Sequence, residues 1–545
     1  MTSKWKRLDA SIRKAAVRLA SSTPLTRRAL QSRNVWRQLD PYQRNAATRA
    51  IEAKRFALFF EQGTGKTWIA GAVAERVLTD ALHLALFVVP LANIETTWTK
   101  FFREQLPNVH LCRTLDEAKE AIILGIVDPR PIVLLLHYED VSKYIDVLRK
   151  VRWQLIVYDE SQRLKNRATQ QSRDAAKFKY GEYRLALSGT PMDEEPQDLW
   201  AQFRFLDKTI LGHRYKDFEE QFFEPIELPS LEGVRRGSWQ WNRLIREIGI
   251  KRSRRKFDMS KRHRLSKIIA PHCLRVVKED VLDLPEMQKR YEWVTLRGKQ
   301  RVLYEEMRDK LVASGMDLTA PLKVTQMSKL QQITGGYVID DNGYTHAVGR
   351  AKMRRVASIL KRLQNEPAVI FTRYVAEAQG IARELIRLGR SVATITGETG
   401  KADRTRIVEM FQEGRLQTIV SQIKTGGVGI DLYRSCHLIV YSPTFSHIDF
   451  DQAIARVYRR GQTRAVTIYM IAAQNTIDEY IYEALVSKQR KTKIILNSLK
   501  GKSYGRCKEE GGARRKEGRD RVQVRSRRRR HEARDPARQR SHRAA

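Results

Sequence analysis

The chain has 545 residues, 42% of them hydrophobic and 30% charged, which is enough for two or three domains with cores of their own. Its four cysteines form no C-x-x-C pair, and its longest apolar run, residues 84–92, is far short of the ~18 residues that cross a bilayer, so a disulfide scaffold, a cysteine-rich zinc site and a membrane span are all excluded. Lys and Arg outnumber Asp and Glu by 102 to 62, and the net charge of +40 predicts a polyanionic partner, nucleic acid before any other. We therefore expect a soluble protein of a reducing cytosol.

The first part of the chain divides into a basic extension and an α/β lobe. Residues 1–35 are basic and helix-compatible, with too few apolar positions for a core. In residues 36–206, short apolar runs alternate with polar stretches that are long enough for crossover helices. This alternation is typical of a parallel sheet covered by helices on both faces. The predicted strands are residues 56–60, 84–89, 132–136, 155–158 and 185–187.

A second α/β lobe follows a long charged region. Residues 207–347 have few apolar runs and are predicted to form a helical insertion, in which residues 251–267 hold nine Lys and Arg against one Asp. Strand-like runs return in residues 348–502, the predicted second lobe. After Leu499 the chain contains no Leu, Ile, Phe, Met or Trp, so residues 503–545 are predicted to be a disordered basic tail. The predicted strands of the second lobe are residues 368–372, 392–396, 418–421, 438–441 and 466–470.

The first predicted strand runs into a glycine-rich turn that is typical of phosphate binding. The turn is Gly63-Thr64-Gly65-Lys66-Thr67. Glycines let backbone N–H groups face phosphate oxygens, Lys66 can reach the β- and γ-phosphates, and Thr67 can hold Mg²⁺. The strict pattern has a glycine where this chain has Phe60. A plain turn joining strand to helix is the alternative, and we favour nucleotide binding.

Two further polar segments follow predicted strands of the first lobe. Asp159 and Glu160 come directly after residues 155–158, where Asp159 would bind Mg²⁺ and Glu160 would orient the water that attacks the γ-phosphate. Residues 187–191 (L-S-G-T-P) end another strand and alone would be an ordinary turn.

The second lobe contributes two arginines at helical spacing. Arg456 and Arg459 are three residues apart, so both lie on one face of a helix and can stabilise the charge that develops during phosphoryl transfer. The alternative is a solvated basic face. The three earlier segments make the functional interpretation the better one.

Taken in this order, the segments resemble the ATPases of helicase superfamily two and, within them, the Swi/Snf-type DNA translocases. The resemblance covers about residues 38–495 and rests on a series of motifs. These are residues 39–43 (L-D-P-Y-Q), 63–67 (G-T-G-K-T), 89–98 (V-P-L-A-N-I-E-T-T-W), 159–166 (D-E-S-Q-R-L-K-N), 188–191 (S-G-T-P), 198–200 (D-L-W), 275–285 (R-V-V-K-E-D-V-L-D-L-P), 329–333 (K-L-Q-Q-I), Thr396, Gly397 and Arg404, 425–431 (T-G-G-V-G-I-D), 452–462 (Q-A-I-A-R-V-Y-R-R-G-Q) and 476–479 (T-I-D-E).

The resemblance implies two RecA-like lobes with ATP and Mg²⁺ in the cleft between them and duplex DNA across both. The catalytic residues it implies are Lys66, Asp159, Glu160, Arg456 and Arg459. The nucleotide-binding residues are Gln43, Gly63, Thr64, Gly65, Lys66, Thr67, Gly429, Asp431 and Gln452, with Thr67 and Asp159 on the metal. Coupling would run through Gln162, Ser188 and Thr190, and through Gly427, Gly429 and Asp431. Nucleic acid would be contacted by Trp98, Lys251, Arg252, Arg254, Arg255 and Lys256.

Two positions depart from the family pattern. Gln162 stands where the family usually has His, although Gln can still donate and accept hydrogen bonds. Ala455 stands where many relatives have a polar or acidic residue. The length leaves no room for an added chromodomain or nuclease domain, so the chain resembles compact prokaryotic or phage-borne members. A prokaryotic or phage-infected cytoplasm is therefore the expected location, with the nucleus as the alternative.

The function predicted from the sequence is an ATP-dependent motor that moves on double-stranded DNA and can rearrange protein–DNA complexes. A strand-separating DNA or RNA helicase is the first alternative, and a nucleic-acid clamp without catalysis is the second. The basic cluster at residues 251–267 would grip duplex phosphates, or would be a solvated helix face. No membrane partner is expected, and protein partners are not predicted.

Overall fold

The computed structural model describes residues 35–80, 83–124, 130–193, 196–225, 255–310, 312–313, 318–319, 323–423 and 430–497. Its contacts divide the chain into two units, residues 1–502 and 503–545, and only the first contains described residues. The predicted basic extension, up to residue 34, and the predicted basic tail lie outside the described part. So do Lys251, Arg252, Arg254, Gly427 and Gly429.

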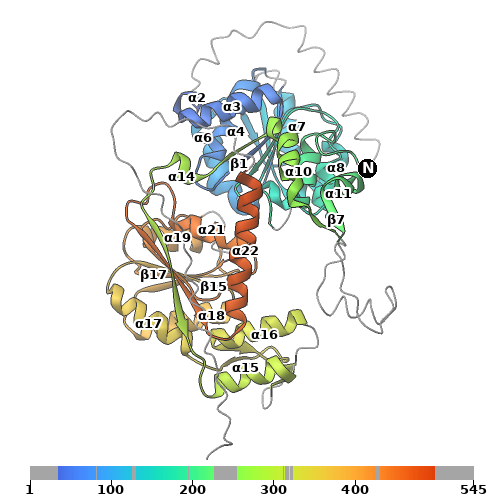
Figure 1. Ribbon diagram of the computed structural model, residues 1–545. Helices are drawn as coiled ribbons and strands as arrows, with labels where there is room; N and C mark the ends of the chain where they lie inside the picture. Colours follow the sequence, from blue (N-terminus) through green and yellow to red (C-terminus); the bar gives the residue numbers. More distant parts are fainter. Residues whose placement is uncertain are drawn as a thin grey trace, which may run out of the picture. The chain divides into compact units, whose positions relative to one another are not determined.

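A parallel sheet of seven strands forms the first lobe, in the order β3-β4-β2-β5-β6-β1-β9 (Figure 1). Alternate residues of β1 enter different cores: Phe56 and Leu58 pack on one face of the sheet, and Ala57 and Phe59 on the other. Both faces are therefore buried, as the continuous apolar runs predicted. The strands are β1 Arg55–Phe60, β2 Leu84–Val89, β3 His110–Cys112, β4 Ile132–His137, β5 Trp153–Asp159, β6 Gly181–Ser188 and β9 Cys273–Val276.

Helices and short strands connect and cover these strands. They are α2 Val35–Gln38, α3 Pro41–Ala53, α4 Lys66–Val77, α5 Leu91–Asn93, η2 Ile94–Thr99, α6 Lys100–Gln105, α7 Leu115–Leu124, α8 Tyr138–Leu148, η3 Ser161–Leu164, α9 Gln170–Ala175, α10 Gln197–Leu206, α11 Tyr215–Phe222, β7 Phe223–Pro225, β8 Arg255–Phe257, η4 Met259–Lys261, α13 Arg262–Ile269 and η5 Ala270–His272.

The second lobe is built around a parallel sheet of six strands, in the order β10-β19-β18-β15-β17-β16. Here too neighbouring residues of a central strand enter different cores, Ile370 on one face and Val369 and Phe371 on the other. The strands are β10 Met287–Val294, β15 Ala368–Thr372, β16 Val392–Ile395, β17 Thr418–Gln422, β18 His437–Val440 and β19 Val466–Ala473. The other elements are α14 Lys278–Val281, α15 Lys299–Lys310, β11 Val312–Ala313, β12 Leu318–Thr319, α16 Lys323–Gly335, β13 Tyr337–Ile339, β14 Thr345–Ala347, α17 Ala351–Leu363, α18 Val375–Arg387, α19 Lys401–Gln412, α21 His447–Val457 and α22 Ile477–Asn497.

The predicted α/β class with two parallel sheets is confirmed, but the helical interpretation of residues 207–347 is wrong in part. Strands β9 and β10 from this region join the first and second sheets, beside β1 and β19. The sequence does not predict β10, because β10 is an edge strand. Its residues 288–291 and 293 are exposed, which leaves no apolar run in the sequence. Arg255 and Lys256, predicted in a helical cluster, lie on strand β8.

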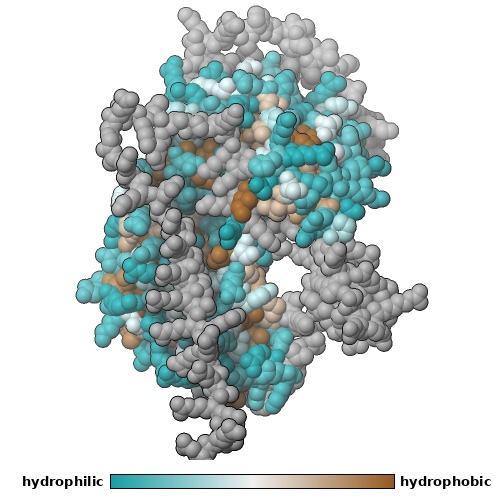
Figure 2. Space-filling view, in the orientation of Figure 1, coloured by the Kyte–Doolittle hydropathy of each residue, from teal (hydrophilic) through white to brown (hydrophobic). Residues whose placement is uncertain are grey.

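The hydropathy of the surface is consistent with hydrophobic residues that lie in buried cores. On the face drawn in Figure 2, hydrophilic residues predominate among the coloured ones and hydrophobic residues form small patches. Within the described ranges, no helix combines the length and the apolar character that crossing a bilayer requires.

A buried ion pair ties α17 to α22 in the second lobe. Lys352 Nζ lies 2.7 Å from Asp478 Oδ2, and both side chains are 0% exposed. Asp478 also accepts hydrogen bonds from Thr334 Oγ1 at 3.0 Å and from the backbone N–H of Ala473 at 3.0 Å. The T-I-D-E segment therefore has a structural role through Asp478.

We expect Lys352→Met to lower the free energy of unfolding by about 3–5 kcal/mol, because it leaves the Asp478 carboxylate buried without its cation. Urea unfolding followed by tryptophan fluorescence measures the change. Lys361→Met, at an exposed position of the same helix, is the control and should change it by less than about 0.5 kcal/mol. Equal losses in the two variants would contradict the expectation.

Candidate functional site

The glycine-rich turn forms a tight loop between β1 and α4. Gly63 and Gly65 have φ of +85° and +87°, which side chains with a Cβ rarely adopt. Lys66, the first residue of α4, turns back so that its Nζ donates a hydrogen bond to the carbonyl of Phe60 at 2.8 Å. Burial lowers the pKa of Lys66, and the charges of Glu160 and Asp159 act in the opposite direction. Thr67, the next residue of α4, is partly exposed.

Gln43 fastens this loop to α3. Its Nε2 donates to the carbonyl of Thr64 at 3.2 Å, and its Oε1 accepts from the backbone N–H of Asp40 at 2.9 Å, completing a capping box. A Cβ added at Gly65 would lie 2.1 Å from Gln43 Nε2, so only glycine allows this contact. Gln43 is 4% exposed, and its amide is used to hold the loop backbone.

Asp159 lies at the end of β5 and receives hydrogen bonds on both carboxylate oxygens. Trp98 Nε1 and Asn93 Nδ2 donate to Oδ2 at 2.9 and 3.4 Å, and the backbone N–H of Glu160 donates to Oδ1 at 3.0 Å. Burial and the neighbouring carboxylate of Glu160 raise the pKa of Asp159 to about 6, although the Trp98 hydrogen bond lowers it. Two carboxyl groups are thus held close together, that of Asp159 buried and that of Glu160 partly exposed.

The prediction that Trp98 contacts nucleic acid is wrong for its side chain. Trp98 is 0% exposed and packs against Phe87 and Phe102, so its ring cannot reach an external ligand. It lies on η2, a π-helical turn that is rare in proteins and often found at functional sites. Its indole instead connects this segment to Asp159.

Glu160 begins a hydrogen-bonded chain that ends at the S-G-T-P segment. It has φ of +52°, a conformation that is uncommon for a residue with a side chain, and its carbonyl accepts a hydrogen bond from Tyr138. Gln162 Nε2 donates to Glu160 Oε2 at 2.7 Å, and Ser188 Oγ donates to Gln162 Oε1 at 2.7 Å. The backbone N–H of Thr190 donates to Ser188 Oγ at 3.1 Å. The three residues predicted to couple these segments are therefore brought into contact.

Both arginines predicted in the second lobe come close to the groups of the first. The charge of Arg456 interacts with those of Glu160 and Lys66, and burial lowers its pKa to about 10. Arg459 forms an ion pair with Asp431. A Cβ added at Gly63 would lie 3.7 Å from Arg459 Cβ, so Arg459 lies directly against the glycine-rich turn.

Other predicted residues lie elsewhere. Gln452 is on α21, where it lines a cavity beside the turn. Lys256 pairs with Glu224 at 3.1 Å on the β7–β8 hairpin. Sequence reasoning missed Asn93 and Tyr138 as partners of residues 159 and 160, because such contacts depend on how distant segments pack.

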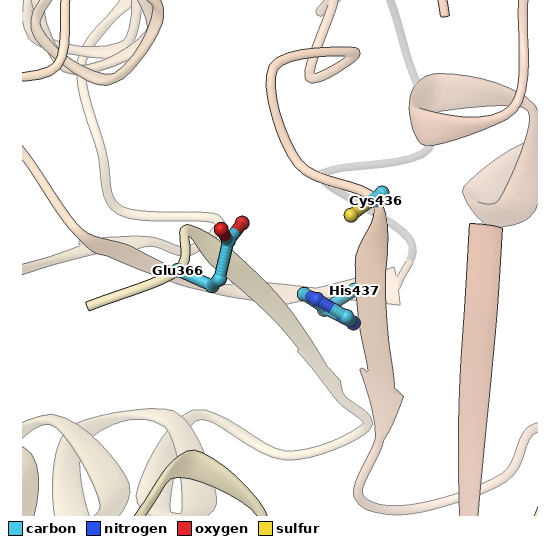
Figure 3. A group of neighbouring side chains, drawn as sticks. All are labelled: Glu366, Cys436 and His437. Carbon is cyan, nitrogen blue, oxygen red and sulfur yellow. The ribbon is translucent and has the colours of Figure 1, made fainter. Parts of the chain in front are cut away.

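A different cluster, Glu366, Cys436 and His437, brings potential metal ligands within 4.8 Å of one another (Figure 3). It lies at the amino ends of β15 and β18, whereas the glycine-rich turn and Asp159 follow the carboxyl ends of their strands. Arg464 Nη1 lies 2.6 Å from Glu366 Oε2, so a guanidinium already neutralises the carboxylate. This cluster is separate from the candidate site.

Family comparisons agree with the motif order. The model of the SNF2-related domain matches residues 32–366, and the model of the helicase conserved C-terminal domain matches residues 351–461. The chain belongs to the SNF2-related family. The resemblance stated from the motifs is confirmed.

Relatives of this SNF2-related chain include bacterial proteins. It is 31% identical over 365 residues to the "Putative ATP-dependent helicase/translocase YwqA" of Bacillus subtilis. The aligned region covers 64% of this chain and 36% of that protein. This chain is 25% identical over 456 residues to an "Uncharacterized ATP-dependent helicase" of Mycoplasma pneumoniae, covering 81% and 40%. The chain thus spans about two fifths of the length of these curated relatives. The solved structure of the "Sulfolobus solfataricus SWI2/SNF2 ATPase core in complex with dsDNA" is 25% identical, covers 85% of this chain and 93% of that one, and has a TM-score of 0.38.

We expect Gln162→Leu in this SNF2-related chain to reduce the stimulation of ATP hydrolysis by DNA about tenfold, because leucine removes the hydrogen bonds that link residue 162 to Glu160 and to Ser188. Steady-state ATP hydrolysis with and without duplex DNA measures this ratio. Gln162→His, which can still donate and accept, should keep most of the stimulation. An unchanged ratio in Gln162→Leu would show that the chain of hydrogen bonds carries no coupling.

Proposed function

We propose that the chain is an ATP-dependent motor that moves along double-stranded DNA and can displace or rearrange bound proteins. The observation that carries the proposal is the meeting of Lys66, Glu160 and Arg456 from two lobes in one partly buried site, where their charges interact. Phosphoryl transfer needs such a set, since catalysis there is mostly positioning and charge stabilisation. Membership in the SNF2-related family supports it.

Each residue has a proposed task in hydrolysis. The loop N–H groups and Lys66 bind the β- and γ-phosphates, and Lys66 exchanges its bond with Phe60 for one to the nucleotide. Glu160 orients the attacking water, and Arg456 and Arg459 stabilise the charge that develops on the γ-phosphate. Asp431 holds Arg459 in place, and Gln43 supports the loop.

The residues present fit the Mg²⁺ ion that this chemistry implies. Thr67 and Asp159 offer oxygen donors, which Mg²⁺ prefers. Burial and the neighbouring Glu160 carboxylate raise the pKa of Asp159 to about 6, a cost that a nearby cation relieves. When bound, Mg²⁺ would neutralise charge on the β- and γ-phosphates.

The domain organisation we propose follows from the sheets. The first lobe comprises residues 36–206 with β9 added, and the second lobe comprises residues 348–502 with β10 added. Arg255 and Lys256, with the neighbouring Lys251, Arg252 and Arg254, are proposed to contact DNA phosphates. The net charge of +40 favours a polyanion without reading its sequence.

Steady-state ATP hydrolysis tests the proposal. We expect activity that rises mainly with duplex DNA, falls as salt rises, and is lost in Lys66→Ala. Preference for single-stranded DNA or RNA would favour a strand-separating helicase, which a forked-substrate unwinding assay would then check. Tight DNA binding without turnover on any polymer would refute the motor and leave a clamp.

A further inference from the structure

A cavity of about 370 Å³ lies beside the glycine-rich turn, between segments of both lobes. Its walls include Gln62 after β1, Thr190 after β6, Arg275 on β9, Lys278 after β9, and Gln452 on α21. Lys66, Glu160 and Arg459 do not line it, whereas Gln452, predicted to bind nucleotide, does, so the cavity borders the site proposed for ATP. The two places are adjacent, because Gln62 precedes Gly63 and the lining residue Ala455 precedes Arg456.

Several polar atoms in the walls of this cavity are buried without a hydrogen-bond partner among the described residues. They are Nε and Nη1 of Arg275, Oγ1 of Thr190 and Oε1 of Gln62. Arg275 is 8% exposed, and its Nη2 lies 3.6 Å from Glu61 Oε1, so Nη2 is paired while Nε and Nη1 have no partner among the described residues. Buried polar groups in proteins are normally satisfied by protein, water, an ion or a ligand. These atoms indicate that the cavity is built to hold something polar.

The chemistry of the wall selects an oxyanion that also carries a hydroxyl group. Arg275 offers N–H donors at Nε and Nη1, which point to different sides of the guanidinium, so one phosphate can take one of them, and Thr190 can donate a second hydrogen bond. Gln62 Oε1 can only accept, so the ligand must supply one donor. Lys278 adds positive charge at 9% exposure.

The carboxylates that line the cavity are already engaged or exposed. Glu61 contacts Arg275 and accepts a hydrogen bond from the backbone N–H of Lys278 at 3.2 Å. Asp451 Oδ1 accepts one from Gln489 Nε2 at 2.6 Å, and Glu279 is exposed. These carboxylates therefore repel a bound anion less strongly than buried carboxylates without partners would. Hydrogenphosphate, with three acceptor oxygens and one hydroxyl, fits the whole set.

We propose that this cavity, the phosphate cavity, receives the inorganic phosphate that ATP hydrolysis produces and holds it while ADP is still bound. The proposal rests on the proposed function. In the reaction, the water oxygen bonds to the γ-phosphorus, and the bond from that phosphorus to the β,γ-bridging oxygen breaks, with its electrons leaving on ADP. One water proton stays on the phosphate as its hydroxyl and the other passes to solvent. Ala455, which lines the cavity, directly precedes Arg456 in the chain.

Equilibrium dialysis of radiolabelled inorganic phosphate against the full chain loaded with ADP tests the phosphate cavity without any turnover. We expect one saturable site, weakened about tenfold or more in Arg275→Gln, because a charged hydrogen-bond donor is lost. Arg387→Gln, at an exposed arginine of α18 that pairs with Glu384, should bind phosphate like the wild type. Sulfate, which has no hydroxyl donor, should compete about tenfold less well than phosphate.

Three results would overturn the proposal: equal binding in Arg275→Gln and the wild type, equal competition by sulfate, or loss of the bound phosphate when ADP saturates the chain. Thr190→Val, which removes one donor at little change in size, gives a second measurement if Arg275→Gln does not fold by circular dichroism. It should weaken phosphate binding by a smaller factor, and unchanged binding would also count against the cavity. Because dialysis needs no hydrolysis, a chain without ATPase activity would refute the proposed function and still give a result here.

Discussion

Glu160→Gln should lower the rate of DNA-stimulated ATP hydrolysis about 10³-fold while ATP and DNA still bind. The side chain keeps its size, and the backbone turn at φ of +52° is held by Tyr138, so the fold around the site should not change. What is lost is the negative charge that we propose orients the attacking water and that interacts with Arg456. Single-turnover hydrolysis, with binding of a fluorescent ATP analogue measured in parallel, separates the two steps.

Glu139→Gln is the matched control for Glu160→Gln. Glu139 is an exposed residue of α8, where it pairs with His137 at 2.6 Å, and the same substitution there should leave the rate unchanged. A Glu160→Gln variant that hydrolyses ATP as fast as the Glu139→Gln variant would remove Glu160 from the proposed chemistry. Loss of ATP binding in Glu160→Gln would instead assign the carboxylate to the binding of nucleotide and metal.

The strands that could be predicted from the sequence are those buried on both faces. Runs such as Leu84–Val89 and Ala368–Thr372 are apolar throughout, because helices cover both sides of each sheet. Strand β10 escaped prediction for the opposite reason: it lies at an edge, with Lys289, Arg290 and Tyr291 exposed. An apolar run in the sequence marks only a strand whose residues are buried, and most residues of β10 are exposed.

The candidate site likewise contains residues that the sequence predicts and contacts that it does not predict. Lys66, Asp159 and Glu160 were predicted because each lies in a motif directly after a strand, and the carboxyl ends of parallel strands share one edge of the sheet. The contact between Trp98 and Asp159, 61 positions apart, has no local signal. The unpaired Nε and Nη1 of Arg275 have no local signal either. The cavity that Arg275 lines is completed by residues of α21 and α22, which come from the far end of the chain.

Arg459→Ala is expected to lower the rate of ATP hydrolysis about 10³-fold, the scale on which a transition-state arginine acts in phosphoryl transfer. Arg459 lies against Gly63, pairs with Asp431 and has its pKa lowered by burial, so its charge is held in a partly desolvated place where it acts strongly. Binding of ATP to the first lobe should remain, because Lys66 and the loop N–H groups are untouched. Rapid-mixing hydrolysis at saturating ATP measures the rate.

The next residue provides the control for Arg459→Ala. Arg460 has a side chain that is 70% exposed and lies 3.8 Å from Asp40, so Arg460→Ala removes the same charge one position away without touching the turn. If the second lobe acts through Arg459, the rates of the two variants should differ by about two orders of magnitude or more. Equal rates would mean that the lobe contributes only general positive potential, in which case raised salt should slow both variants alike. A slow Arg459→Ala that still couples its residual hydrolysis to duplex DNA would place Arg459 in chemistry and leave movement to other contacts of the second lobe.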